Sequence, residues 1–256
     1  MNYKNIFDSH AHYDDDQFND DRDSLLSSVA EGGICGCITC GTNTKNALKA
    51  MELAEKYPFM YAAVGLHPLD IEDEENEDYI DFFRSLSSNE KVVAIGEIGL
   101  DYHYDCAPRE KQIEVLEKQI ILANELDLPV IVHDRESHED IMNILKKHKP
   151  KGVVHCFSGS VEMMKEVVKL GMYIGLGGAV TFKNAKKPVE VAREVPADRL
   201  LIETDAPYMT PVPFRGKRND SSLIPYTAEK IAEVRSATAQ EILDLTSKNA
   251  KELFGI

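Results

Sequence analysis

Apolar segments rich in Val, Ile, Ala and Gly alternate along the chain with segments in which apolar residues recur at helical spacing. Eight apolar segments are nearly continuous in hydrophobicity, which is typical of strands buried on both faces of a parallel sheet. They cover residues 6–12, 33–41, 59–68, 91–101, 128–135, 152–159, 172–180 and 199–207. This alternation predicts parallel strands joined by crossover helices.

The helical spacing is clearest in residues 109–127, where Ile113, Leu116, Ile120 and Ala123 form one stripe. The other segments predicted to be helical are 23–33, 46–57, 137–148, 160–171, 186–195 and 226–254. Several of them end on Gly, which readily adopts the positive φ that a helix C-cap needs.

Eight strand and helix units within 256 residues are typical of an α/β protein with a (β/α)8 or TIM barrel. A doubly wound open sheet is the alternative. It is less favoured because polar residues follow at least five of the strands directly, as the mouth of a barrel requires. We therefore predict a single barrel domain over residues 1–256, without an interdomain linker.

Composition excludes disorder, collagen-like repeats and a disulfide scaffold, because 43% of residues are hydrophobic and only five are cysteine. The chain carries 44 acidic and 29 basic residues, a net charge of −15, which argues against coating of nucleic acid. However, 18 acidic and 5 basic residues fall within positions 1–81. The rest of the chain is nearly neutral, so the total does not exclude a locally positive site.

No apolar run approaches the ~18 residues of a membrane span, and the N-terminus does not resemble a signal peptide. We therefore expect a cytoplasmic protein with no membrane partner. Cys35, Cys37 and Cys40 lie in one apolar segment, where neighbours on a strand are badly placed to form disulfides. A zinc cluster is the alternative, but paired C-x-x-C spacing is absent, so buried free thiols are the prediction.

Six metal-ligating side chains follow or end the apolar segments. His10 and His12 form H-A-H at the end of the first, where positions i and i+2 share a strand face. The full set is His10, His12, Glu97, His133, His155 and Asp205. Buried imidazoles and carboxylates that converge at a barrel mouth suit a pair of divalent ions bridged by one carboxylate. We therefore predict two divalent ions, with Zn, Mn, Co and Mg all compatible with these ligands.

Seven motifs together resemble the TatD family of metal-dependent deoxyribonucleases, within the amidohydrolase-like barrels. They are D-S-H-A-H (8–12), G-L-H-P (65–68), G-E-I-G-L-D-Y (96–102), V-H-D-R (132–135), H-C-F-S-G (155–159), E-T-D-A-P-Y (203–208) and R-G-K-R-N (215–219). The resemblance runs nearly end to end and implies the same six metal ligands. The one departure is Asp220-Ser221-Ser222, where members often carry Glu-Pro, and it leaves the conformation of this loop open.

On this resemblance we expect a deoxyribonuclease of the 3′–5′ exonuclease type that uses a metal-activated water. Asp205 is the candidate for accepting the proton of that water, and Glu97 for bridging the ions. Glu203 is expected either to orient the water or to support a ligand from behind. His67 is expected to donate a proton to a phosphate oxygen or the leaving group, unless it only packs against Pro68.

The most basic short segment, residues 211–220, follows the eighth predicted strand. Its Arg215, Lys217 and Arg218 are candidates for binding substrate phosphate, and Arg135 is a fourth. The expected substrate is DNA, as single strands or 3′ ends, and a monomer is compatible with the sequence. The alternatives are a metal-dependent ester or amide hydrolase on the same barrel, including an aminoacyl-tRNA deacylase, and a non-catalytic binding barrel.

Overall fold

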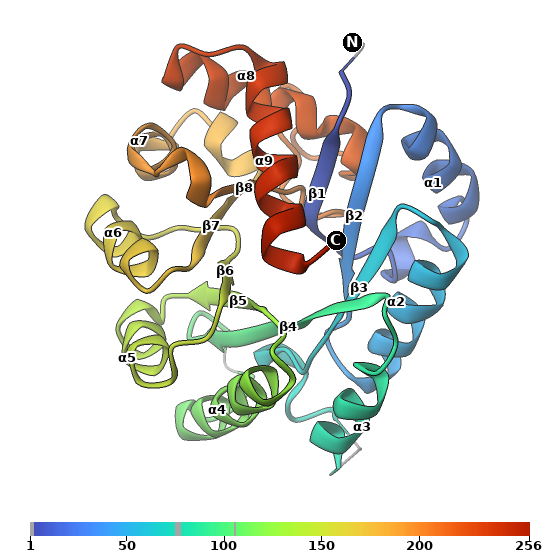
Figure 1. The fold of residues 1–256 in the computed structure, drawn as a ribbon, viewed down its shortest axis with the longest axis vertical. Coiled ribbons are helices and arrows are strands. Elements are labelled where there is room, and N and C mark those ends of the chain that lie inside the picture. Colours follow the sequence, from blue (N-terminus) through green and yellow to red (C-terminus); the bar gives the residue numbers. More distant parts are fainter. Residues whose placement is uncertain (1–2, 75–77, 105) are drawn as a thin grey trace.

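The computed structural model describes residues 3–74, 78–104 and 106–256, and within them the strands form one sheet in the order of the sequence (Figure 1). The strands are β1 (Ile6–Ala11), β2 (Ile34–Cys40), β3 (Met60–Val64), β4 (Val92–Asp101), β5 (Val130–Arg135), β6 (Gly152–Val154), β7 (Tyr173–Leu176) and β8 (Leu200–Ile202). All seven consecutive pairs are parallel. The chain just after β8 closes the ring on β1, because Asp205 N donates to His10 O (2.9 Å) and His12 N to Ala206 O (2.7 Å). The predicted TIM barrel is confirmed.

Helices surround the sheet on its outer face, as Figure 1 shows. In the described residues they are α1 (Arg22–Glu31), α2 (Thr44–Lys56), α3 (Tyr79–Leu86), α4 (Arg109–Leu126), α5 (His138–His148), α6 (Val161–Lys169), α7 (Lys186–Glu194), α8 (Ile224–Arg235) and α9 (Ala239–Phe254). Every predicted helical segment contains helix, but residues 226–254 form two. Ser236 ends α8 with a φ of 54°, and Thr238 begins α9 with a capping box to Glu241. Helix α3, which follows the acidic run, was not predicted.

Several predicted strands extend too far toward the carboxyl end. Strand β6 ends at Val154 and β8 at Ile202, so His155 and Asp205 lie in the loops just beyond them. The chain turns away from the sheet there, because Cys156 has a φ of 43° and Asp205 a φ of 58°. These left-handed residues end the alternation of side chains between the two faces of the strand.

The amino end of the barrel is filled and the carboxyl end is open. Inside the barrel, Phe7, Ile131 and Leu201 pack in one cluster with Ala250 and Phe254 of α9. Helix α9 crosses this end in front of the strands in Figure 1, where Asn249 donates to the carbonyls of Ala197 (2.8 Å) and Leu200 (2.9 Å). A ligand can therefore enter only from the opposite end, where the predicted metal ligands are.

The cysteines behave as predicted. The three cysteines of β2 form no disulfide; Cys37 and Cys40 are buried and Cys35 is half-buried. Among the described residues, no group of side chains that could hold a metal ion includes a cysteine. None of the helices in the described ranges combines the length and apolar composition that crossing a membrane needs.

Candidate metal centre

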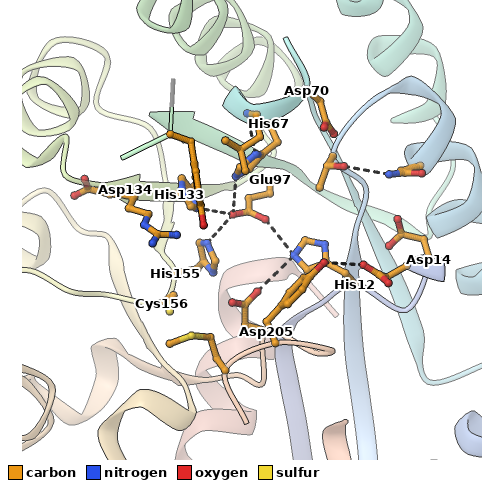
Figure 2. Close-up of a pocket in the computed structure, with 18 of the residues that line it drawn as sticks. His12, Asp14, His67, Asp70, Glu97, His133, Asp134, His155, Cys156 and Asp205 are labelled. Carbon is orange, nitrogen blue, oxygen red and sulfur yellow. Dashed lines mark hydrogen bonds and ion pairs between the residues drawn. The ribbon is translucent and has the colours of Figure 1, made fainter. Parts of the chain in front are cut away.

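The six predicted ligands meet at the open end of the barrel, around the carboxylate of Glu97. Figure 2 labels all of them except His10. On one side of this carboxylate, its Oε2 lies 3.3 Å from His10 Nε2 and 3.2 Å from His12 Nε2. Asp205 Oδ1 completes this group, 3.7 Å from the first of these nitrogens and 3.5 Å from the second. His10 lies on β1, His12 just after it, and Asp205 in the loop after β8. Glu97 lies in the middle of β4 and not, as predicted, at its end, because the strand continues to Asp101. The closure of the barrel brings these side chains together.

On the other side, Glu97 Oε1 lies 3.0 Å from His133 Nδ1 and 2.8 Å from His155 Nε2. Each oxygen of this one carboxylate thus faces its own pair of imidazole nitrogens. Such an arrangement suits a carboxylate that bridges two cations.

Two of the imidazoles are held in the tautomer that a metal ligand needs. His12 Nδ1 donates to the carbonyl of Cys40 (2.8 Å), so its Nε2 lone pair points into the site. His133 Nε2 lies 3.1 Å from Asp101 Oδ2, which leaves its Nδ1 lone pair directed at Glu97. Hydrogen bonds of this kind orient ligating histidines and raise their basicity.

His155 gives a direct test of whether a metal fits. In the described structure both of its ring nitrogens are buried and neither forms a well-aligned hydrogen bond, although Nε2 lies 2.8 Å from Glu97 Oε1. Its Nδ1 lies 3.6 Å from Glu203 Oε1, which also accepts a hydrogen bond from the amide of Cys156. Burial of polar groups without such bonds is costly. A cation bound at Nε2 would satisfy this nitrogen, and the nitrogen and oxygen ligands fit a divalent ion.

Glu203 lies behind His155, and this placement depends on a glycine. A Cβ atom on Gly175 of β7 would lie 2.5 Å from Glu203 Oε2, so a larger residue there would displace this carboxylate. Because β8 ends before Glu203, this side chain does not share a strand face with Asp205. Of the two roles expected for Glu203, the structure therefore favours support of a ligand.

The charges in the site are strongly coupled. Burial by itself would raise the pKa of Glu97, but the surrounding His155, His67 and His10 lower it well below its usual range. Burial by itself would lower the pKa of His12, but Asp205 and Glu97 raise it well above its usual range. Without metal, protons thus occupy the positions that cations would take, and metal binding has to release them.

His67 lies beside the ligands but in a different tautomer. Its Nδ1 accepts a hydrogen bond from Leu69 N (3.1 Å), so in the neutral ring the proton is on Nε2, 3.4 Å from Glu97 Oε1. Burial lowers the pKa of His67, which favours this neutral ring. Its distance to Glu97 and His133 would allow it to share an ion, yet the ring lacks a free lone pair toward the site. His67 is therefore placed as a hydrogen-bond donor.

All of the predicted ligands except His10 line a cavity of about 670 Å³, which is large enough for a nucleotide. Arg135 lies on its rim, with the guanidinium 4.8 Å from the centre of the Tyr104 ring. Arg215 and Lys217 instead line a smaller neighbouring cavity. Arg218 lies at that cavity too, but it forms a two-bond ion pair with Asp21 (2.8 and 2.6 Å). Among the described residues, Arg218 is the predicted cation whose charge is neutralised by a carboxylate of the chain.

Asp8 and Asp101 lie within the motifs but were not predicted to have a role. Asp101, four residues after Glu97 and directly before Tyr102, holds His133 from behind. Asp8, two residues before His10, is fully buried and accepts hydrogen bonds from Thr204 and Ser221. Each is a carboxylate in an otherwise apolar strand, close in sequence to a predicted ligand, and this is the signal that could have identified them.

Comparison with known proteins agrees with the motifs. The model of the TatD-related DNase family matches residues 7–255. The chain belongs to this family. It is 47% identical to YabD of Bacillus subtilis, named an uncharacterized metal-dependent hydrolase, over 98% of this chain and 99% of the relative. It is 33% identical to a protein of Erwinia tasmaniensis named 3′-5′ ssDNA/RNA exonuclease TatD, over 98% of this chain and 100% of the relative.

Solved structures of TatD proteins share the fold closely. The crystal structure of YjjV, a TatD homologue from Escherichia coli, superimposes with a TM-score of 0.91 at 35% identity, covering 98% of both chains. The predicted resemblance and the metal-dependent hydrolase class are thereby confirmed. The Asp220-Ser221-Ser222 departure is also accommodated, because Ser221 is buried and its hydroxyl donates to Asp8 Oδ2 (2.6 Å).

Proposed function

We propose that this TatD-family hydrolase uses two divalent ions to cleave nucleic acid, releasing nucleotides from the 3′ ends of single-stranded DNA. The observation that carries the proposal is the position of Glu97, whose two oxygens face two separate groups of imidazoles at the floor of an open cavity. The name of the Erwinia relative supports the choice of substrate and polarity.

In this proposal His10, His12 and Asp205 would hold one ion and His133 and His155 the other, with the carboxylate of Glu97 available to both. Such a pair of ions lowers the pKa of water and neutralises charge on the phosphate oxygens. The ligands suit Zn, Mn, Co and Mg, so we leave the metal to the experiment below.

Asp205 is the group we assign to accept the proton of the attacking water. Its side chain is 17% exposed, against 4% for Glu97, so it is the ligand carboxylate that reaches into the cavity. Its pKa is lowered, because its hydrogen bond to His12 and the neighbouring His10 and His155 outweigh burial. His67 Nε2–H is assigned to donate to a phosphate oxygen or to the departing 3′-oxygen.

The test uses metal-stripped enzyme, a series of metals, and 3′- and 5′-end-labelled single- and double-stranded DNA, RNA and acylated tRNA. We expect stepwise loss of mononucleotides from the 3′ end of single strands. The Asp205→Asn variant should lose this activity and keep its thermal stability, while the exposed control Asp198→Asn should keep both. Turnover of esters or amides with none on any polynucleotide would overturn the proposal, and normal turnover in Asp205→Asn would overturn the role of Asp205.

We also propose a single-domain cytoplasmic enzyme. The three cysteines of β2, none of them in a disulfide and two of them buried, support a reducing compartment.

A further inference from the structure

A second cavity, of about 300 Å³, lies directly beside the metal cavity. Tyr208 and Met209 line both cavities, so together they form the wall between them. The second cavity is also lined by Phe182, Arg215 and Lys217. None of its lining residues is a candidate metal ligand, so this cavity has no part in the metal centre itself.

The two exposed cations of this cavity lack protein counterions. Neither Arg215 nor Lys217 forms an ion pair with a carboxylate anywhere in the described residues, whereas Arg218 beside them is paired with Asp21. The Arg215 guanidinium lies 3.8 Å from the centre of the Phe182 ring. Stacking on an aromatic face restrains the guanidinium and leaves its N–H edges free to bind an anion with two parallel bonds.

On one side of the metal cavity the rim is acidic, and this side disfavours the binding of a second phosphate. Asp14, Asp15 and Asp70 line it on the side of β1 and β3, and Figure 2 shows Asp14 and Asp70 together on that side, away from Asp134. The Tyr208 hydroxyl donates to Asp15 Oδ2 (2.8 Å), which fixes the ring between the acidic rim and the basic cavity. This ring is 50% exposed, a surface on which a nucleobase can stack.

We infer that the second cavity binds the phosphate that precedes the scissile one in a nucleic acid strand, with Arg215 and Lys217 as its ligands and Tyr208 stacking against the intervening nucleoside. This inference rests on the proposed function and adds a subsite to it. The terminal nucleotide occupies the metal cavity, and the strand leaves over the wall formed by Tyr208. Arg135, on the rim near β5, is the competing cation.

The test compares two dinucleotides that differ by this one phosphate, d(TpT) and its 5′-phosphorylated form d(pTpT). For wild-type enzyme we expect kcat/KM for d(pTpT) to be roughly tenfold higher, through a lower KM, as a charge-assisted phosphate contact at an exposed site implies. Arg215→Gln and Lys217→Gln should reduce this ratio toward one by raising the KM for d(pTpT).

The matched control is Arg199→Gln. Arg199 also stacks on an aromatic ring, 5.1 Å from the centre of Tyr173, but it precedes β8 at the opposite end of the barrel. It should keep the wild-type ratio. Equal use of both dinucleotides by the wild type would overturn the inference, as would a ratio that is lost in Arg135→Gln and kept in Arg215→Gln.

Binding measurements test this inference separately from the proposed function, because they do not depend on hydrolysis. The Kd values of both dinucleotides are measured on metal-loaded Asp205→Asn, which is designed to bind without turnover. A roughly tenfold preference for d(pTpT) that disappears in Asp205→Asn/Arg215→Gln supports the subsite even if hydrolysis follows another route. Equal affinities overturn the subsite and leave the proposed hydrolysis to its own test.

Discussion

The buried carboxylate of Asp8 makes the stability of the metal-free protein depend on pH. Asp8 lies on β1, fully buried, two residues before His10. It accepts hydrogen bonds from Thr204 N (3.0 Å), Thr204 Oγ1 (2.7 Å) and Ser221 Oγ (2.6 Å), and no basic side chain forms an ion pair with it in the described residues. Burial raises its pKa from 3.8 to about 7, against the opposing effect of these hydrogen bonds.

The raised pKa of Asp8 sets both the direction and the size of the change in unfolding free energy with pH. The folded protein retains a proton on Asp8 that the unfolded chain releases above pH 4, so the contribution of Asp8 to stability is lost as pH rises from about 4 to 7. A pKa of about 7 in place of 3.8 corresponds to about 4 kcal/mol. In Asp8→Asn this ionisation is absent, while the amide oxygen still accepts from Thr204 N. The free energy of unfolding of the variant, relative to the wild type, should therefore rise by up to about 4 kcal/mol between pH 4 and pH 8.

Urea unfolding of both proteins in excess chelator, from pH 4 to 8, measures this difference. Taking the difference cancels the contribution of all other titrating groups that the substitution leaves unchanged. The exposed control Asp198→Asn should differ from the wild type by at most about 0.5 kcal/mol at every pH. A difference between Asp8→Asn and wild type that stays flat from pH 4 to 8 would refute the reasoning.

Three further predictions concern the metal centre. Glu203→Gln removes the charge behind His155 and should weaken metal affinity by roughly 10- to 100-fold, measured by competition with a chelating dye; unchanged affinity would contradict the supporting role. His67→Asn should lower kcat by roughly 100-fold at normal metal content, and loss of metal instead would make it a ligand. A divalent ion at 100 times its Kd should stabilise the protein by about 2.7 kcal/mol in calorimetry, and no shift in Tm would argue against a site in the folded state.

The barrel and its ligands could be predicted from sequence because both depend on local patterns. A parallel strand buried on both faces has to be apolar, so a histidine or carboxylate at its carboxyl end stands out. His133, at the end of an apolar strand, is such a residue. Barrel closure then requires these ends to meet at one mouth, which turns separate positions in the sequence into a site.

The structural features that could not be predicted from the sequence depend on contacts between distant segments. The sharp turns at Cys156 and Asp205 are set by tertiary packing, so strand periodicity overestimated the length of β6 and β8. The tautomer of His67 depends on one backbone amide, that of Leu69. The position of Glu203 depends on the space above Gly175, a residue of a different strand. None of these features has a periodic signal along the chain.

The charge distribution shows how a protein with a net charge of −15 can act on a polyanion. Its net negative charge is concentrated before position 82, and Asp14, Asp15 and Asp70 of that segment lie on one side of the metal cavity. A continuing phosphate backbone is repelled on that side, while the unpaired Arg215 and Lys217 attract it on the side of the second cavity. Under the proposed function, this uneven charge allows a nucleic acid strand to bind with its end in the metal cavity. It disfavours binding of a strand that continues through the cavity on both sides. The acidity then favours action at strand ends, because it opposes the binding of uninterrupted strands.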